Sequence, residues 1–322
     1  MPKVSDPRKF SSNGMDFGKL RRLFFPQNVT GPATRNKRIK FLLKLNFIKN
    51  SYLKRLSEHA FYLAITFILM PAFIYFELCI VFPTLIEPWS LAFFFHYSCA
   101  SFLTLNIMGN MVFGVFTNTT IRGINLEGFN QEGWTLCSVC ECLRPPRAWH
   151  CDTCEICVLK RDHHCTYFTC CIGYYNHRYF MWYTFYLCVA MIYSFYHNIK
   201  YMYLFLTWNH GLTLIKFICP LASLALDFGD ESLYIFLVVI NGILGLFTGF
   251  LFIYHFINIL KGRLVPETKS YTKDFIYNKG WKLNVIEVFG TRWYLTWILP
   301  FIHSKLPGNG IEWHLEDKSK IY

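Results

Sequence analysis

A chain of 322 residues in which 53% of the side chains are hydrophobic and only 16% are charged is more apolar than soluble domains of this size. Its formal net charge is +12. The composition favours an integral membrane protein and argues against a soluble enzyme. We attribute the positive charge to orientation in the membrane and attraction to anionic lipid, and we expect no nucleic-acid partner.

Four apolar stretches are long enough to approach or exceed the ~20 residues that cross the hydrocarbon of a bilayer. Together they contain one charged side chain, Glu77. The sequence therefore predicts an all-α integral membrane protein with four transmembrane helices, at 59–86, 91–115, 179–198 and 234–260.

Both ends of the chain are basic, with 14 Lys and Arg against three acids in 1–58 and ten against six after residue 260. Short segments rich in Lys and Arg stay on the cytosolic side, and four spans return the chain to its starting side. We therefore expect both termini in the cytosol. Residues 35–58 are expected to form a helix on the cytosolic leaflet or a mobile basic tail, and 201–225 a lumenal loop.

The region between the second and third spans holds nine of the thirteen cysteines. The predicted topology places it in the cytosol, where thiols stay reduced, so metal binding explains these cysteines better than disulfides. The chain accordingly divides into a basic region (1–58), two helices (59–115), a Cys-rich insertion (116–178), two more helices with a lumenal loop (179–260) and a C-terminal region (261–322).

The spacing of the cysteines indicates structural zinc. Cys137 and Cys140 form one Cys-x-x-Cys pair, and Cys151 and Cys154 form another. Two tetrahedral zinc sites need eight ligands, and each pair supplies two from one tight turn. A module this small lacks an adequate apolar core, so metal would supply the missing folding energy. The remaining candidates in the insertion are His150, Cys157, His164 and the Cys170–Cys171 pair, with Cys142 interpreted as a small buried hydrophobe.

Cys165 stands apart because an acid and a histidine precede it closely. In the order Asp162, His163, Cys165, the acid can orient the imidazole and the imidazole can accept the proton of the thiol. This combination is typical of an activated cysteine nucleophile. We therefore predict that Asp162, His163 and Cys165 are catalytic.

These residues resemble the DHHC family of protein S-acyltransferases, integral membrane enzymes that attach palmitate and related fatty acids to cysteines. The similarity begins at Cys137 and continues through RPPRAWHC (144–151), CEIC (154–157), DHHC (162–165) and CIGYYNHRYF (171–180). Near the C-terminus, NVIEVFG (284–290) resembles the Asn-x5-Gly element of the family.

The resemblance implies how the ligands divide between two zinc ions. One zinc would be held by Cys137, Cys140, His150 and Cys157, and the other by Cys151, Cys154, His164 and Cys171. It also implies short β-hairpins around the zincs, fatty acyl-CoA such as palmitoyl-CoA as the donor, and a thioester on Cys165. The acceptors would be cytosolic cysteines of membrane-associated proteins, and the location would be the endoplasmic reticulum or Golgi membrane.

An acyl-CoA site joins a polyanion to an insoluble chain. The acyl chain would occupy an apolar cavity among the spans, and nearby basic side chains are candidates for the CoA phosphates. A solvated face or lipid headgroup contact is the alternative role for these residues, which are Lys160, Arg161, Arg147 and Arg178.

Three departures from the family pattern surround this site. The family usually reads Pro-Trp-Val-Asn-Asn-Cys after the catalytic cysteine, whereas this chain has TYFTCC (166–171). The Asp-Pro-Gly after the second span is replaced by TNTTIRG (117–123), and the Thr-Thr-x-Glu after the fourth keeps only Glu267. A threonine of that motif braces the catalytic acid, and the side chain of Val265 has no donor. Cys170 is expected to be an unligated neighbour, with zinc competition or a second acylation as alternatives.

Two other functions fit parts of the sequence. The eroded motifs suggest a zinc-stabilised scaffold without catalysis, for which the identity of His163 would not matter. A transporter or receptor is suggested by polar residues inside the spans, although such groups usually pair between helices. These residues are His96, Asn106, Asn110, Asn241 and His255.

Overall fold

The computed structural model describes most of the chain beyond the basic N-terminal region. The described residues are 60–62, 64, 68, 70–124, 126, 133–205, 210–227, 229–269 and 276–313. The predictions for 1–58, including the helix or tail at 35–58, lie outside these residues.

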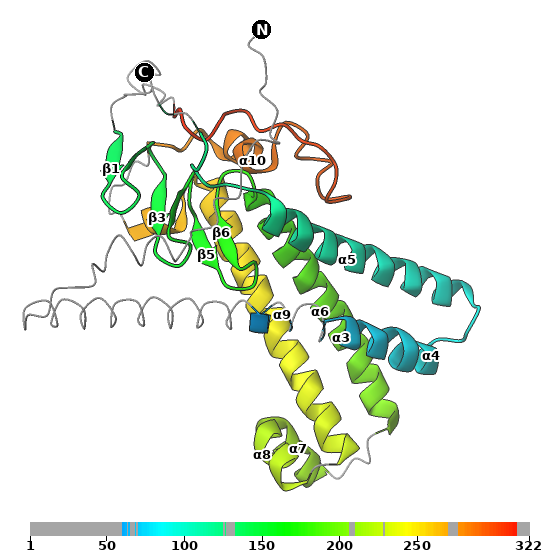
Figure 1. Ribbon diagram of the computed structural model, residues 1–322. Coiled ribbons are helices and arrows are strands. Elements are labelled where there is room, and N and C mark those ends of the chain that lie inside the picture. The colour runs from blue at the N-terminus through cyan, green and yellow to red at the C-terminus, as the bar shows by residue number, and fades with distance from the viewer. Residues whose placement is uncertain are drawn as a thin grey trace, which may run out of the picture. The chain divides into compact units, whose positions relative to one another are not determined.

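Three long helices form the framework of the described chain (Figure 1). They are α5 (Leu91–Phe116), α6 (His177–Phe205) and α9 (Asp230–Leu260). Helix α6 packs against both α5 and α9. Ser90 caps α5 by accepting the N–H of Phe93 at 3.1 Å, which satisfies one of the donors left free at a helix start.

The first predicted span is divided. It contains α3 (Met70–Phe76), a π-helical turn η2 (Glu77–Val81) and α4 (Phe82–Leu85). Glu77 lies inside this apolar segment and is 7% exposed. Its Oε1 accepts a hydrogen bond from Ser194 Oγ of α6 at 2.6 Å and another from Asn198. These hydrogen bonds from α6 to one oxygen of the buried acid join the segment to the bundle.

Within the described residues, two helices are long and apolar enough to cross a membrane, namely α5 and α9. Helix α6 has 29 residues, but its many Tyr and His side chains make it more polar. The apolar helices from Met70 to Leu85 are shorter. Along the chain, the described structure thus has one such helix before the Cys-rich insertion and one after it. The count of four spans is part of the function proposed below.

The segment predicted as a lumenal loop, 201–225, contains helical structure. Helix α6 continues to Phe205, and α7 (His210–Ile218) and α8 (Pro220–Leu226) follow. Lys216, one of the residues that interrupts the apolar pattern, lies 2.9 Å from Glu231 and 3.3 Å from Asp227. Because the polar side chains pair locally, the segment can fold into short helices beside the N-terminal start of α9.

The insertion between α5 and α6 consists of three antiparallel β-hairpins, as the sequence predicts. The pairs are β1 (Thr135–Cys137) with β2 (Cys142–Arg144), β3 (Trp149–Cys151) with β4 (Ile156–Val158), and β5 (His163–Cys165) with β6 (Cys170–Ile172). In each hairpin the last turn residue has a left-handed backbone, with φ of 50° at Glu141, 54° at Glu155 and 52° at Thr169. The three hairpins therefore share one turn geometry at equal spacing along the chain.

The C-terminal region packs at the hairpin end of the bundle, opposite α7 and α8 (Figure 1). It contains a 3-10 turn η3 (Val265–Lys269) and α10 (Trp281–Phe289). Asn284 Nδ2 donates to Leu260 O, the last residue of α9, at 3.0 Å. Gly290 has φ of +83°, and a Cβ there would overlap Ser304 Oγ. The Asn-x5-Gly element thus joins α10 to the end of α9.

Candidate metal centres and active site

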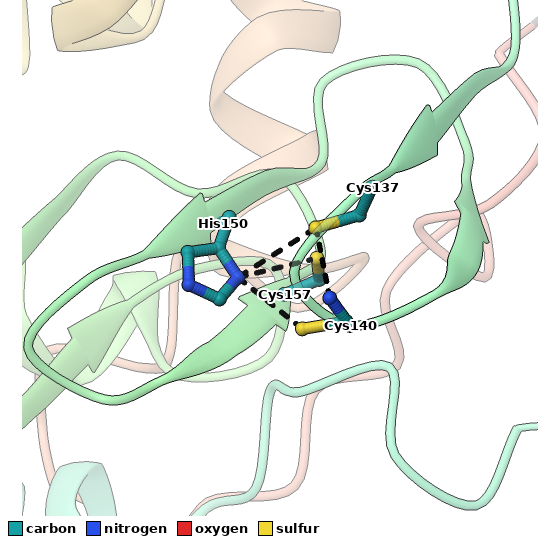
Figure 2. A group of neighbouring side chains, drawn as sticks. All are labelled: Cys137, Cys140, His150 and Cys157. Atoms are coloured by element: carbon teal, nitrogen blue, oxygen red, sulfur yellow. Dashed lines mark hydrogen bonds between the residues drawn. The ribbon is translucent and has the colours of Figure 1, made fainter. Parts of the chain in front are cut away.

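Three cysteines and one histidine from the first two hairpins converge on one point (Figure 2). His150 Nδ1 lies 3.2 Å from Cys140 Sγ, 3.7 Å from Cys137 Sγ and 3.9 Å from Cys157 Sγ. Tetrahedral zinc with Zn–S bonds of ~2.3 Å separates its ligand atoms by roughly 3.4–3.8 Å. The four side chains therefore fit a structural metal ion.

A second cluster repeats this arrangement one hairpin further along the chain. His164 Nδ1 lies 3.3 Å from Cys154 Sγ, 3.7 Å from Cys151 Sγ and 3.8 Å from Cys171 Sγ. In both clusters the N–H of the second cysteine of the Cys-x-x-Cys pair points at the first sulfur, at 3.4 Å. Two Cys/His clusters able to bind metal are therefore present.

Each cluster takes its Cys-x-x-Cys pair from the turn of one hairpin and its other two members from the next hairpin. Those two members face each other across paired strands, as His150 with Cys157 and His164 with Cys171. A metal ion in each cluster would therefore link neighbouring hairpins in series. The eight residues fall into the same two groups that the family resemblance implies.

The third hairpin supplies a cysteine that belongs to neither cluster. Cys165 ends β5 as Cys137 ends β1 and Cys151 ends β3. At the position of the second cysteine of a Cys-x-x-Cys pair this hairpin has Phe168, which is fully buried with its ring 5.1 Å from that of Tyr183. The turn is retained while the metal-binding partner is lost, so the thiol of Cys165 remains outside both clusters.

Two further cysteines also lie outside the two clusters found among the described residues. Cys142 is the strand partner of Cys137, and Cys170 is the strand partner of Cys165. Cys171, not Cys170, stands with His164. The geometry gives no support to competition of Cys170 for zinc.

Asp162 and His163 form the predicted pair at the start of β5. His163 Nδ1 lies 2.8 Å from Asp162 Oδ2. When Nδ1–H donates to the carboxylate, the lone pair of Nε2 is available as a proton acceptor. The other carboxylate oxygen, Oδ1, accepts the main-chain N–H of Val265 at 3.0 Å. Asp162 therefore has a main-chain donor at Val265, whose side chain offers none.

The surroundings of Asp162 and Cys165 shift the pKa values of the two groups in opposite directions. Burial alone raises the pKa of Asp162, but the hydrogen bond from His163 and the adjacent imidazole of His255 outweigh it and hold the pKa well below its usual range. Cys165 is 8% exposed, and burial raises the pKa of its thiol to about 11. The carboxylate is therefore charged, and the thiol needs a base to ionise.

His255 was not assigned to this site by the sequence. Its Nδ1 lies 3.1 Å from Asp162 Oδ2, and its ring centroid lies 4.9 Å from that of His163. It comes from α9, far from the insertion in sequence. An ionisable residue near the end of an apolar span indicates a functional residue, and this is the signal in the sequence that could have pointed to His255. Only the packing of α9 against the hairpins shows that Asp162 is its partner.

Buried ion pairs connect the hairpins to the C-terminal region. Arg147 donates from Nε and a terminal nitrogen to the two carboxylate oxygens of Glu267, both at 2.9 Å. Lys160 Nζ lies 2.7 Å from Glu287 Oε1. Burial alone raises the pKa of Glu287, but Lys160 and Arg147 lower it to about 2. Arg147 and Lys160 are thus buried and paired with carboxylates, so of the four basic candidates these two favour neither contact with CoA phosphates nor a solvated face.

The other two basic candidates have different surroundings. Arg178 lies over the ring of Tyr179 at 4.5 Å and donates to its hydroxyl at 2.5 Å. Arg161 is only partly buried. These two residues remain the candidates for contact with CoA phosphates.

An apolar cavity lies between the α3–α4 segment, α5 and α6. Ile107 lines it and also belongs to the buried cluster that contains Cys165 and Phe168. The cavity therefore shares Ile107 with the buried core that includes Cys165. Its other lining residues include Met70, Phe73, Ala100, Leu103, Leu187, Ala190, Met191 and Ser194.

Comparison with known proteins identifies relatives of this chain. The family model described as DHHC palmitoyltransferase matches residues 130–274. The chain is 31% identical over 227 residues to the probable palmitoyltransferase ZDHHC24 of Mus musculus, covering 66% of this chain and 75% of the relative. It is 30% identical over 244 residues to the same-named protein of Rattus norvegicus, covering 71% and 81%. The palmitoyltransferase PFA3 of Debaryomyces hansenii is 43% identical over 58 residues, or 18% and 14% of the two chains.

Proposed function

The chain belongs to the DHHC palmitoyltransferase family, and we propose that it transfers a fatty acyl group, palmitoyl in particular, from acyl-CoA to cysteines of membrane-associated proteins. The acyl group is carried as a thioester on Cys165. The observation that supports this most directly is the position of Cys165 in the third hairpin, outside both Cys/His clusters and on the same short strand as His163.

The proposed reaction has two steps on the same thiol. His163 Nε2 accepts the proton of Cys165, and the thiolate attacks the carbonyl carbon of the acyl-CoA thioester. The CoA thiolate leaves and takes up a proton. A substrate thiolate then attacks the Cys165 thioester, so the acyl group moves to the substrate and Cys165 is regenerated. Asp162 stays charged throughout and stabilises the imidazolium of His163.

Two structural Zn²⁺ ions are part of this proposal, one in each Cys/His cluster. Bound zinc would supply folding free energy and hold successive hairpins together. His164, between His163 and Cys165, would be fixed by the second ion, and its neighbour His163 would face the carboxylate. The chemistry on the thiol would then be carried by residues that bind no metal.

The membrane setting follows from the helices and the reaction. We infer four spans, with the hairpins and both termini on the cytosolic side, and the endoplasmic reticulum or Golgi as the membrane. The apolar cavity between α3, α5 and α6 would hold the acyl chain while CoA remains in water. Substrates would be proteins with a cytosolic cysteine close to the bilayer.

The test is acylation of the purified full-length protein by alkyne-labelled palmitoyl-CoA. Hydroxylamine-sensitive label on the wild type, its loss in Cys165→Ser, and transfer to a membrane-anchored peptide thiol are the expected results. Mass spectrometry of the same sample would locate the thioester and count the zinc. Full labelling of Cys165→Ser, with transfer intact, would contradict the proposal.

The alternatives have less support. The scaffold hypothesis came from eroded motifs, but the Asp162–His163 contact and the brace on Asp162 are both present. Two of the polar residues suggested for a transport path pair between elements, since Asn241 donates to Ser194 Oγ at 2.7 Å and Asn106 to Ile298 O at 3.2 Å. These two residues therefore serve helix packing.

A further inference from the structure

We propose that His255 is a positioning residue of this enzyme, which holds Asp162, and through it His163, in the orientation that proton transfer from Cys165 requires. The proposal rests on the acyltransferase function proposed above. It assigns a role to an ionisable side chain of α9 that the sequence connected only with a polar path through the spans.

The carboxylate of Asp162 is shared by two imidazoles. Oδ2 lies 2.8 Å from His163 Nδ1 and 3.1 Å from His255 Nδ1. The ring of Phe180 packs edge-on against both, with its centroid 4.8 Å from His163 and 5.0 Å from His255. The arrangement of the two rings on one oxygen is therefore fixed by packing as well as by polar contact.

Burial makes these contacts important. Asp162 is 2% exposed and His255 is 6% exposed, so the carboxylate cannot replace a missing partner with bulk water. A buried carboxylate oxygen that lacks a partner costs free energy. Oδ1 accepts the N–H of Val265 and Oδ2 accepts that of His163, while His255 Nδ1 lies 3.1 Å from Oδ2, at ion-pair distance but without the alignment of a hydrogen bond. Loss of His255 would leave His163 as the only one of these side chains on Oδ2.

The three contacts come from different parts of the chain and converge on one side chain. His163 is the residue after Asp162 and opens β5, whereas His255 belongs to α9 and Val265 follows the C-terminal end of that helix. The carboxylate therefore fixes the position of the third hairpin relative to α9. A hairpin displaced from α9 would lose His255 and Val265 together, and the direction of the His163 ring would no longer be fixed.

His255 is not assigned as a second base. Its Nδ1 faces Asp162, and the strand that carries Cys165 already carries His163. Asp162, His163 and His255 also have ligand atoms within 4.8 Å of one another, the spacing of a metal site. Metal counting therefore has to accompany the kinetics.

The experiment compares His255→Leu, which lacks a donor, with His255→Asn, whose amide N–H can reach a similar place. His197→Leu is the matched control, since His197 is a buried histidine of α6 that bonds Tyr193 O at 2.9 Å, away from the hairpins. Each full-length variant is purified in detergent, its zinc is counted, and single-turnover acylation of Cys165 is followed across acyl-CoA concentrations.

We expect His255→Leu to slow maximal acylation by about 10- to 100-fold, the range for partners that orient a functional side chain from behind. Half-saturation by acyl-CoA and zinc content should match the wild type, and His255→Asn should recover most of the rate. Wild-type speed in His255→Leu, equal slowness in His255→Asn, or loss of a zinc equivalent in either would overturn the positioning role. An inactive wild type would instead refute the proposed function itself.

Discussion

The main-chain N–H of Val265 donates to Asp162 Oδ1 at 3.0 Å, although the valine side chain has no hydrogen-bonding group. Val265 opens the 3-10 turn that follows α9, and Glu267 in the same turn accepts the N–H of Leu264 at 2.8 Å. The turn is thereby held in shape by its own acid. The backbone of Val265 thus donates a hydrogen bond to Asp162 that its side chain could not donate.

This contact predicts a difference between two substitutions at one position. Val265→Thr should leave the rate of Cys165 acylation within about twofold, because the N–H is retained. Val265→Pro removes the donor and should reduce the rate by about tenfold or more, since hydrogen bonds to charged groups contribute ~1.5–3 kcal/mol. The measurement is single-turnover acylation at matched zinc content. Equal rates for the two variants would show that the brace is unimportant.

The two Cys/His clusters predict distinct effects of cysteine substitutions on zinc content. The wild type should contain two zinc ions per chain, and Cys154→Ser should lose at least one, because Cys154 Sγ lies 3.3 Å from His164 Nδ1 and 3.8 Å from Cys171 Sγ. Cys142→Ser is the control and should keep both, since Cys142 belongs to neither cluster. Elemental analysis of the purified proteins tests this, and a zinc loss in Cys142→Ser would require a different ligand set.

The Cys-rich insertion was accessible from sequence because its information is local. Metal ligands repeat at short spacing, each hairpin turn joins three-residue strands, and Asp162, His163 and Cys165 lie within four consecutive residues. The equal spacing of Cys137, Cys151 and Cys165 was also readable, and it would have marked Cys165 as the member whose turn has Phe168 in place of a second cysteine.

Contacts between distant segments were not accessible in this way. His255 meets Asp162 only because α9 packs beside the third hairpin, and no local pattern specifies that approach. The sequence favours contact with CoA, solvent or lipid for Arg147 and Lys160. Their carboxylate partners, Glu267 and Glu287, are more than a hundred positions away in the chain, so no local pattern reveals the pairing. Burial of a charge depends on tertiary packing, which a charge count along the chain does not contain.

The buried pair of Arg147 and Glu267 predicts a stability difference between breaking and replacing it. Glu267→Gln should destabilise the protein by about 1.5–3 kcal/mol, because the buried guanidinium loses the charge of its bidentate partner while Glu287 remains 3.5 Å away. Arg147→Met combined with Glu267→Met should be less harmful, since no unpaired charge remains and Glu287 keeps Lys160 and Lys279. Thermal unfolding in detergent measures the order. A double variant less stable than the single one would contradict it.

The facing cysteines of the third hairpin predict which one carries the acyl group. Cys170 is the strand partner of Cys165, and burial raises the pKa of its thiol to about 12. It is not on the strand of His163, so it lacks the base assigned to Cys165. Cys170→Ser should retain most of the hydroxylamine-sensitive label, while Cys165→Ser should lose it. Peptide mapping that finds the thioester on Cys170 in the wild type would reverse this assignment.

The cavity between α3, α5 and α6 predicts that acyl-chain preference can be changed from α6. Ala190 lines this cavity and packs against the buried cluster around Cys165. A phenyl ring at this position would fill space that the acyl chain is proposed to occupy. Ala190→Phe should therefore favour shorter chains, and the ratio of myristoyl to palmitoyl transfer should rise relative to the wild type. Direct competition between the two acyl-CoAs on the same protein sample measures this ratio.

A matched substitution separates filling of the cavity from a general effect of added bulk. Ala72 in α3 is exposed and does not line the cavity, so Ala72→Phe adds the same ring to the outer surface of the bundle. It should leave the preference for palmitoyl unchanged. If both variants shift the ratio equally, the change does not arise in the cavity. If neither does, the acyl chain lies elsewhere, because an added ring in a filled site must exclude part of its occupant.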